Sequence, residues 1–290
     1  MKREDGGDEN EIEKSLISKK PKLDLSTNSR QSKLIHKVIL KFIRSKKHII
    51  VIIGAGVSVD AGIPDFRSPK GLFASMKSSL PSNYSVEDIF DLQTFLDNPA
   101  LFYSAARSFA SIEKAKPTAV HRWLQLMQPS LQLVITQNID SLESELSCPL
   151  IYLHGLLASG TCQNCSQKAS KQTMFDHYRK GKVAYCQCGG VIKPDIVFYN
   201  ESINSDLIQS IQTASKTCDL LVVMGTSFST QPMTGLLRWF DHCDVVVLNQ
   251  TSVNLPSRPI DRLSLQVLGS FRTIFEEAEG DSEEGFWDGV

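Results

Sequence analysis

The feature that most constrains the fold of this chain is residues 51–73, VIIGAGVSVDAGIPDFRSPKGLF, where an apolar run enters a glycine turn. The run begins as HIIVII at residues 48–53, a composition typical of a strand buried on both faces of a parallel sheet. Gly54 and Gly56 have no Cβ, so we expect their backbone N–H groups to approach an anion at the start of a helix. The pattern favours a phosphate, most simply that of a dinucleotide, although a tight turn without a ligand has the same sequence.

Composition places the chain among globular proteins. Its 290 residues are 41% apolar and 22% charged, which is enough for one large domain with a smaller companion. No run approaches the ~20 apolar residues of a membrane span, and the N-terminus has no signal-peptide core. We therefore expect an intracellular protein, nuclear and/or cytoplasmic, that binds no membrane. In a reducing compartment the seven cysteines favour metal ligands or buried thiols over disulfides.

Both ends of the chain have the composition of disordered tails. Residues 1–30 are polar and charge-dense, and residues 276–290 hold seven acids without a Lys or Arg. Such segments bury too little apolar surface to repay the entropy of ordering. The tetrapeptide KKPK at residues 19–22 fits either a nuclear-import signal or a solvated tail. The folded domain is therefore expected over residues 31–275.

A helical insertion is predicted over about residues 74–128. This stretch shows no strand pattern, and its short amphipathic segments are broken by Pro99 and Pro117. Tyr103 and Arg107 lie one helical turn apart within it, and we interpret them as an exposed helix face rather than as an anion clamp. His121 is interpreted as a packed or hydrogen-bonded histidine.

Polar or small residues follow each further strand that the sequence predicts. These strands are LQLVIT at residues 131–136, LIYL at 150–153, DLLVVM at 219–224 and DVVVL at 244–248, with a last one at 263–268. The carboxyl ends of parallel strands meet at one edge, where open α/β sheets bind ligands. His154 is a candidate general base there, since its ordinary pKa lies near neutrality. The other residues at these ends are Gln137, Asn138, Ile139, Asp140, Gly225, Thr226, Ser227, Asn249, Gln250 and Ser270.

Four cysteines in two close pairs predict a metal module over about residues 156–192. Cys162 and Cys165 are separated by two residues, and Cys186 and Cys188 by one, a pattern typical of a tetrahedral structural Zn²⁺. Because two or more intervening residues are usual, Cys186 is the weakest of the four candidates. Four protein thiolates leave no position for a reactive water. The module is followed by KPDIVFYNE at residues 193–201, an extended segment that its proline confines to a sheet edge.

Together these features predict a doubly wound, Rossmann-like parallel α/β domain with a helical insertion and a smaller zinc-binding module. A hydride-transfer dehydrogenase is disfavoured, because the third glycine of GxGxxG and an acid ~20 residues later are both missing. A P-loop is excluded, because no Gly-Lys-Ser/Thr follows the turn.

The motifs of this chain resemble, in order and spacing, those of the sirtuin family of NAD-dependent protein deacylases. They are GAGVSVDAGIPDFRS at residues 54–68, TQNID at 136–140, HG at 154–155, the two cysteine pairs, KPDIVFYNE at 193–201 and GTS at 225–227. The resemblance covers about residues 32–275. GLF at 71–73 and Leu142-Glu143 are similar to the class I branch, whose members chiefly remove acetyl groups from lysine.

The resemblance implies NAD as a co-substrate and a role for each matching residue. Ala55, Gly56, Ser58, Thr226, Ser227 and Asn249 would hold the diphosphate and adenosine half, with Gly54, Gln137, Gly225, Gln250 and Ser270 beside them. Ile63, Asp65, Asn138, Ile139 and Asp140 would form the nicotinamide and ribose pocket, with Phe66 and Arg67 over the ribose. His154 and Asn138 would be catalytic.

The implied reaction begins when the acetyl-lysine oxygen attacks the nicotinamide ribose and nicotinamide leaves. His154 then acts as a general base on a ribose hydroxyl, which yields free lysine and O-acetyl-ADP-ribose. The implied partners are acetylated-lysine proteins, histone or non-histone, with no direct nucleic-acid binding. The peptide would lie along Val197 and Phe198 and the loop at residues 228–233.

Two departures from the family pattern keep alternatives open. The FSTQPM loop at residues 228–233 is more polar than is usual in the family, and Ser141 stands where glycine is common. A deacylase for longer chains, a mono-ADP-ribosyltransferase and a non-catalytic NAD-binding scaffold are the alternative functions.

Overall fold

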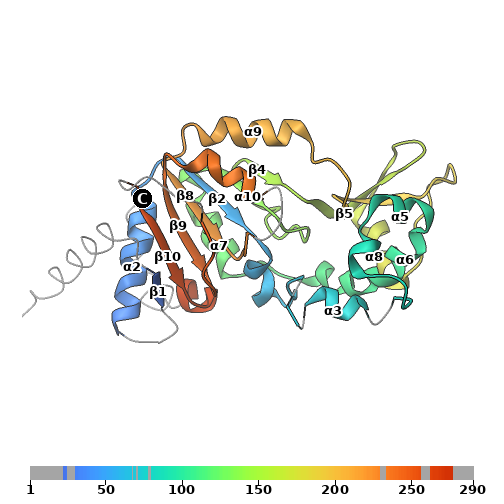
Figure 1. Ribbon diagram of the computed structural model, residues 1–290, viewed down its shortest axis with the longest axis horizontal. Helices are drawn as coiled ribbons and strands as arrows, with labels where there is room; N and C mark the ends of the chain where they lie inside the picture. The colour runs from blue at the N-terminus through green and yellow to red at the C-terminus, as the bar shows by residue number, and fades with distance from the viewer. Residues whose placement is uncertain are drawn as a thin grey trace, which may run out of the picture.

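The computed structural model describes residues 22–24, 30–66, 68–69, 71–77, 80–228, 233–255 and 262–276. Within them, seven strands form one sheet in which all hydrogen-bonded neighbours are parallel (Figure 1). In spatial order they are β1 (Lys22–Asp24), β10 (Ser264–Leu268), β9 (Asp244–Asn249), β8 (Leu220–Met224), β2 (Ile49–Ile53), β3 (Leu131–Thr136) and β4 (Leu150–Tyr152).

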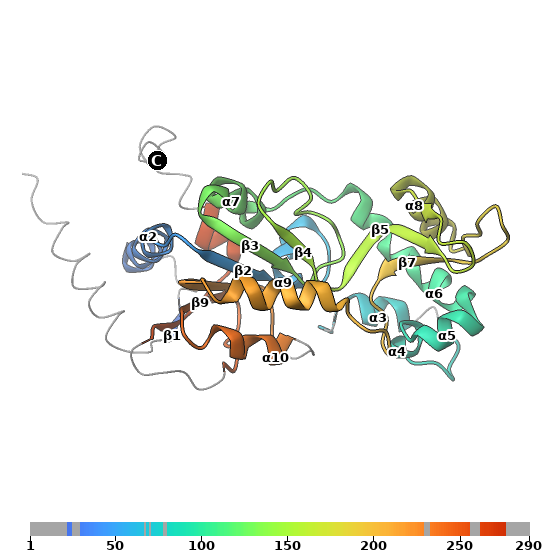
Figure 2. The same ribbon diagram turned by 90° about the horizontal axis from the view of Figure 1, so that it is seen from above.

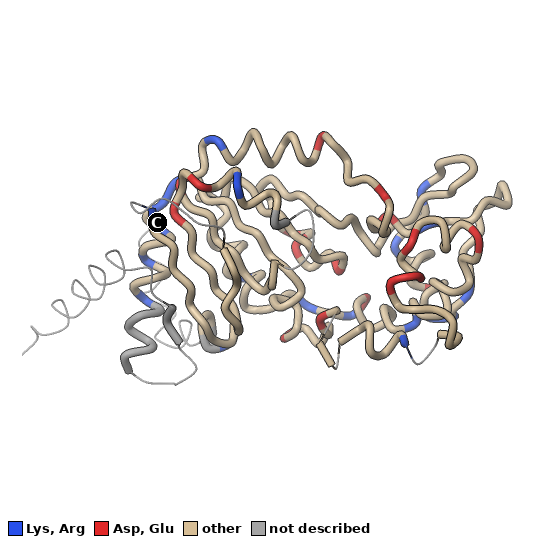
Figure 3. Tube along the Cα trace, in the orientation of Figure 1, with Lys and Arg blue, Asp and Glu red and all other residues tan. Residues whose placement is uncertain are grey.

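Helices cover both faces of this sheet. Helices α2 (Arg30–Arg44) and α7 (Ala119–Met127) lie on one face, and α9 (Ser205–Ser215) and α10 (Met233–Leu236) lie on the other (Figure 2). Along β2 the side chains alternate, so that Val51 and Ile53 join the core under α2 and α7 while Ile50 and Ile52 join the core under α9. Strands β2, β3 and β8 carry no charged residue (Figure 3). Their continuous apolar sequences follow from burial on both faces.

The sheet has a switch point beside β2. The chain adds β3 and β4 on one side of β2 and later returns to add β8, β9 and β10 on the other side. Open α/β sheets bind ligands in a crevice at such a switch point, outside the carboxyl ends of the strands. This topology confirms the predicted doubly wound fold.

A second, smaller unit combines the two predicted insertions. It contains the antiparallel sheet β6-β5-β7 and packs around aromatic side chains. The Phe102 ring lies 6.4 Å from the Tyr178 ring and 5.3 Å from the Phe198 ring, centroid to centroid. Its elements are α3 (Leu72–Lys77), α4 (Val86–Ile89), α5 (Leu92–Asp97), α6 (Pro99–Ala105), η2 (Ala106–Lys114), β5 (Gly155–Cys162), β6 (Lys168–Ala169), α8 (Lys171–Lys180) and β7 (Ile192–Ile196).

The strand predictions are confirmed, with shifts of one or two residues at some ends. Helix α6 begins at Pro99, and β7 is an edge strand, as its proline predicts. Helix α7 falls within the range predicted as an insertion, yet it packs against the large sheet. None of the described helices is long and apolar enough to cross a membrane.

Two expectations are corrected. Tyr103 does not lie on an exposed helix face, because its ring is fully buried and its hydroxyl donates to Ile192 O at 2.6 Å. Arg107 is exposed and donates to Lys180 O at 3.0 Å, so the two residues form no anion clamp. Residues 22–24, within the expected tail, form an edge strand that pairs with β10. Most of both predicted tails lies outside the described residues.

Candidate functional site

The glycine turn brings the ends of β2 and β8 into direct contact. Gly54 N donates to Met224 O and Gly56 N donates to Gly225 O, both at 2.9 Å. A Cβ at Gly54 would lie 2.8 Å from Gly225 O, and one at Gly225 would lie 2.6 Å from the backbone nitrogen of Val57. The glycines therefore permit backbone contact between the two loops. The N–H groups of Gly54 and Gly56 bond to the protein, which corrects our expectation that they face an anion.

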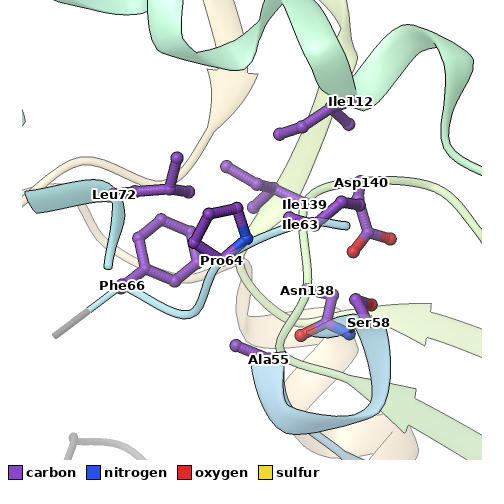
Figure 4. Close-up of a pocket in the computed structure, with 10 residues that line it drawn as sticks. All are labelled: Ala55, Ser58, Ile63, Pro64, Phe66, Leu72, Ile112, Asn138, Ile139 and Asp140. Atoms are coloured by element: carbon purple, nitrogen blue, oxygen red, sulfur yellow. Dashed lines mark hydrogen bonds between the residues drawn. The ribbon is translucent and has the colours of Figure 1, made fainter. Parts of the chain in front are cut away.

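A pocket opens beside this turn (Figure 4). The Asn138 amide donates from Nδ2 to Ser58 Oγ at 3.2 Å, and the Asp140 carboxyl lies near both, while Phe66 and Pro64 stand at the opposite side. The wall thus combines a polar end with an apolar end. The lining residues are Ala55, Ser58, Ile63, Pro64, Phe66, Leu72, Ile112, Asn138, Ile139 and Asp140. Sequence reasoning assigned no site role to Pro64, Leu72 or Ile112. Pro64 and Leu72 lie within the motifs at residues 54–68 and 71–73, whereas the sole sequence signal of Ile112 is its apolar character.

Asp140 has a perturbed carboxyl group. Burial, followed by the negative charge of nearby Glu143, raises the pKa of Asp140 to about 6. The Leu142 backbone N–H donates to Asp140 Oδ1 at 3.0 Å and favours the ionised form. At neutral pH the side chain is therefore mostly ionised and can accept hydrogen bonds inside the pocket.

His154 is held in one tautomer. Its Nδ1 lies 2.8 Å from Gln137 O, and because a carbonyl oxygen can only accept, Nδ1 carries the proton. Burial is the main cause that lowers the pKa of His154 below its ordinary value. The ring is therefore neutral at neutral pH, and the lone pair of Nε2 is available as a base.

The ends of β3, β8 and β9 are joined by side-chain hydrogen bonds. Gln137 Nε2 donates to Thr226 Oγ1 at 3.0 Å, and Asn249 Nδ2 donates to Thr226 O at 3.0 Å. Gln250, Ser227 and Ser270 are exposed at the same edge of the sheet. The polar strand-end residues predicted from sequence therefore converge on the crevice.

The loop between the glycine turn and α3 is held by internal hydrogen bonds to Asp65. Ser68 N donates to Asp65 Oδ1 at 2.8 Å, and Leu72 N donates to Asp65 O at 2.8 Å. The Phe66 ring packs edge-on against Phe73 at 5.9 Å. These contacts hold Phe66 at the pocket. Arg67 and most of the 228–233 loop lie outside the described residues.

The segment after β7 connects the small unit to His154. Val197 N donates to His154 O at 2.9 Å. The Phe198 ring is buried among aromatic rings, 5.3 Å from that of Phe95. The Phe198 side chain is therefore not available to a ligand.

A buried network of hydrogen-bonded polar side chains holds the end of β3 in place. Thr118 N donates to His121 Nδ1 at 3.1 Å, so the other ring nitrogen carries the proton and faces Glu143 Oε1 at 3.4 Å. Thr136 Oγ1 donates to the same carboxylate at 3.2 Å and accepts from Asn138 N at 3.0 Å. His121 is a hydrogen-bonded core histidine, as predicted. The sequence alone did not reveal that Glu143 connects it to the pocket.

All four predicted cysteine ligands come together. Their sulfur atoms lie within 4.8 Å of one another, with Cys162 to Cys188 at 3.5 Å and Cys165 to Cys186 at 3.6 Å. A tetrahedral Zn²⁺ with bonds of about 2.3 Å separates its sulfur ligands by about 3.8 Å, so the cluster fits such an ion. Cys186, the weakest candidate by spacing, takes part.

A parallel sheet with a pocket at its switch point, and a cluster of four cysteines on a smaller unit, defines a Rossmann-like protein with a metal-binding module. The family model described as "Sir2 family" matches residues 54–232, which is more than half of the chain. The chain therefore belongs to the Sir2 family, which confirms the resemblance drawn from its motifs.

Proteins named NAD-dependent deacetylases are similar to this chain in sequence. The chain is 34% identical over 242 residues to NAD-dependent protein deacetylase sir-2.1 of Caenorhabditis elegans, covering 82% of this chain and 39% of that protein. It is 33% identical over 287 residues to NAD-dependent deacetylase sir2A of Dictyostelium discoideum, covering 92% of this chain and 53% of that protein. The chain thus spans about half or less of these two relatives. A Cutibacterium acnes NAD-dependent protein deacetylase is 36% identical over 200 residues, covering 68% and 80%.

Solved structures show the same fold. One from work on the structural basis of sirtuin substrate affinity has a TM-score of 0.69 and 27% identity, covering 83% of this chain and 98% of that one. A Sir2 homolog in complex with NAD has a TM-score of 0.67 and 22% identity, covering 87% and 93%.

Proposed function

We propose that this chain is an NAD-dependent protein lysine deacetylase that transfers the acetyl group to ADP-ribose and releases nicotinamide. The observation that carries the proposal is the neutral His154, which does not line the pocket but whose Nδ1 is held by the carbonyl of Gln137, the residue before the pocket residue Asn138. The names of the relatives support the same activity. The proposed substrates are acetylated proteins, histone or non-histone, met in the nucleus or cytoplasm without direct nucleic-acid binding.

The chemistry of the pocket wall suits the nicotinamide end of NAD. The amide of Asn138 and the carboxyl of Asp140 supply donors and acceptors at one end, and Ile63, Phe66 and Ile139 supply an apolar wall. The diphosphate and adenosine half would be held by Ala55, Ser58, Gln137, Thr226, Ser227, Asn249, Gln250 and Ser270, while Gly54, Gly56 and Gly225 would belong to this set as the glycines that let the two loops approach. Asp65 and Arg67 complete the proposed cofactor set.

The residues of the chain have distinct proposed tasks. NAD, when bound, supplies the ribose carbon that the acetyl oxygen attacks as nicotinamide leaves. The ionised Asp140 accepts from the carboxamide N–H groups, and Asn138 orients the ribose. His154 Nε2 removes the proton of a ribose hydroxyl. Phe66 and the apolar wall exclude water from the reacting centre.

Val197 and Phe198 would bind the peptide through their carbonyl oxygens, because the two residues follow β7 beside His154 and their N–H groups already donate to His154 O and Glu201 Oε2. The four-cysteine cluster would hold one structural Zn²⁺, whose position has no opening for a reactive water.

The test is turnover of an acetyl-lysine peptide with and without NAD by wild type and His154→Ala. We expect NAD-dependent release of nicotinamide and a fall in kcat of about 100-fold or more in the variant, the usual effect of losing a general base. His242→Ala removes an exposed histidine and is the matched control. Full turnover by His154→Ala would overturn the assignment.

A further inference from the structure

Lys193 is a buried lysine on β7, shortly before the proposed peptide-binding segment at Val197 and Phe198. It is 5% exposed, and its ammonium donates to Ile196 O at 2.8 Å and Pro194 O at 3.2 Å and pairs with Glu201 Oε2 at 2.9 Å. A buried ammonium is costly unless each of its three N–H groups has a partner. All three donors are satisfied here, so Lys193 is built into the segment that follows it.

Glu201 completes the arrangement from the other end of the segment. Its Oε2 accepts from Phe198 N at 2.8 Å, while its own backbone N–H donates to Phe198 O at 3.1 Å. The Lys193 ammonium also lies 4.4 Å from the centre of the Phe198 ring, within cation–π range. The two side chains together fix the backbone at Ile196 and on both sides of Phe198. We call this pair the Lys193–Glu201 brace.

The braced segment is joined to the catalytic strand and to the helical insertion. Val197 N donates to His154 O at 2.9 Å, and Gly155 pairs with Ile196 across β5 and β7. On the other side Tyr199 N donates to Phe90 O at 2.7 Å. A shift of the segment would therefore move the backbone that carries His154 relative to any peptide beside it.

We propose that Lys193 and Glu201 are positioning residues for the acyl-lysine peptide. The inference rests on the proposed function. A peptide that adds to a strand edge by main-chain bonds needs that edge in one fixed conformation before it binds, since ordering it later would subtract from affinity. The Lys193–Glu201 brace holds the edge in one conformation through contacts on the buried side of the segment. Neither residue lines the pocket proposed for the nicotinamide end of NAD, so we expect the brace to affect peptide binding more than NAD binding.

The first test separates peptide from NAD kinetics. Lys193→Met removes the ammonium at similar volume, and Glu201→Gln removes the charge while its amide oxygen can still accept from Phe198 N. We expect the peptide KM to rise tenfold or more in Lys193→Met and less in Glu201→Gln, with the NAD KM changed less than twofold. Lys168→Met is the matched control, because Lys168 forms an exposed ion pair with Asp195 in the same unit and its side chain is 69% exposed.

A purely structural role predicts a different pattern, with thermal stability reduced and both KM values either unchanged or raised together. Either result overturns the positioning role. If Lys193→Met does not fold, Glu201→Gln alone decides by the same criterion. The two variants should also be non-additive, because each removes the same pair.

The second test requires no turnover. Amide hydrogen exchange of residues 196–201 should be at least tenfold faster in Lys193→Met than in wild type, and unchanged in Lys168→Met. Unchanged exchange in Lys193→Met would overturn the brace whatever the enzyme does. Faster exchange with an unchanged peptide KM would overturn the link between the brace and substrate binding. A wild-type chain without deacetylase activity would contradict the proposed function, while the exchange result still decides the brace.

Discussion

At the scale of single residues, burial changes the pKa of two side chains at the site, and the change costs stability at Asp140. Burial and the charge of Glu143 raise the pKa of Asp140 to about 6, above the usual range of an aspartate, so its ionised form is disfavoured in the folded protein. Burial lowers the pKa of His154 and keeps its ring neutral. Asp140 is therefore mostly a carboxylate at neutral pH and loses this form as the pH falls through about 6, while the lowered pKa of His154 keeps its ring neutral at neutral pH.

Asp140→Asn should separate stability from function. A carboxyl whose folded pKa exceeds its unfolded value destabilises the protein at neutral pH, and this cost disappears as the pH falls toward the unfolded value. The variant should gain about 1–2 kcal/mol at pH 7.5 and lose deacetylation. Urea unfolding at pH 7.5 and pH 4.5 measures the gain, which should be smaller at the lower pH. A loss of stability at pH 7.5 would contradict the shifted pKa.

Ser141→Gly should stabilise the fold. Ser141 has φ of 67°, in the left-handed region, and its buried hydroxyl has no hydrogen-bond partner. Glycine adopts this conformation without a Cβ penalty, so we expect a gain of about 1 kcal/mol in urea unfolding. Ser144→Gly, in the same loop and without a positive φ, should be neutral or destabilising. Equal effects at the two positions would refute the strain at Ser141.

At the scale of elements, the site depends on how closely β2 and β8 approach. Gly225 combines φ of 65° with a position where a Cβ would lie 2.6 Å from Val57 N. Gly62 has φ of 79° but open space around its Cβ position. The two glycines therefore separate backbone strain from steric overlap.

Gly225→Ala should cost about 2 kcal/mol or more and reduce NAD binding, because the loops must separate. Gly62→Ala should cost about 1 kcal/mol, the strain alone. Denaturant unfolding of both variants gives the comparison. A Gly225→Ala protein as stable as Gly62→Ala would show that the contact between the loops is not required.

The large-sheet strands β2, β3, β4, β8, β9 and β10 and the site edge could be predicted from the sequence because they depend on local patterns, whereas β1, β5 and β6 were not predicted. HIIVII and DLLVVM are apolar throughout their strand residues, which only a doubly buried strand requires, and parallel strands must share one carboxyl edge. Tyr103 could not be placed, since its burial depends on α8 and β7 packing over it. The same holds for Leu72 and Ile112, whose pocket contacts arise from tertiary packing. The spacing of the cysteines predicted their cluster but not the aromatic core beside it.

At the scale of the whole molecule, the large sheet and the small unit meet at one site. The large sheet presents its strand ends, and the small unit supplies Ile112, Leu72 and the peptide segment. The cysteine cluster anchors the far end of β5, whose near end follows His154. A metal ion held there would therefore stabilise the small unit more than the sheet.

Cys186→Ser should lower bound zinc from about one ion per chain to less than half, because a tetrahedral site loses a ligand. Cys148→Ser, a half-buried cysteine outside the cluster, should retain full zinc. Metal analysis of the purified proteins gives the stoichiometry. Full zinc in Cys186→Ser would exclude Cys186 as a ligand.

The central claim is that NAD is consumed as the acetyl group is removed. Mass spectrometry of one reaction, with the wild-type chain, NAD and an acetyl-lysine peptide, measures nicotinamide, deacetylated peptide and acetyl-ADP-ribose together. We predict one nicotinamide and one acetyl-ADP-ribose for each lysine released, and no deacetylation without NAD. Deacetylation without NAD, or an ADP-ribosylated peptide that keeps its acetyl group, would contradict the account.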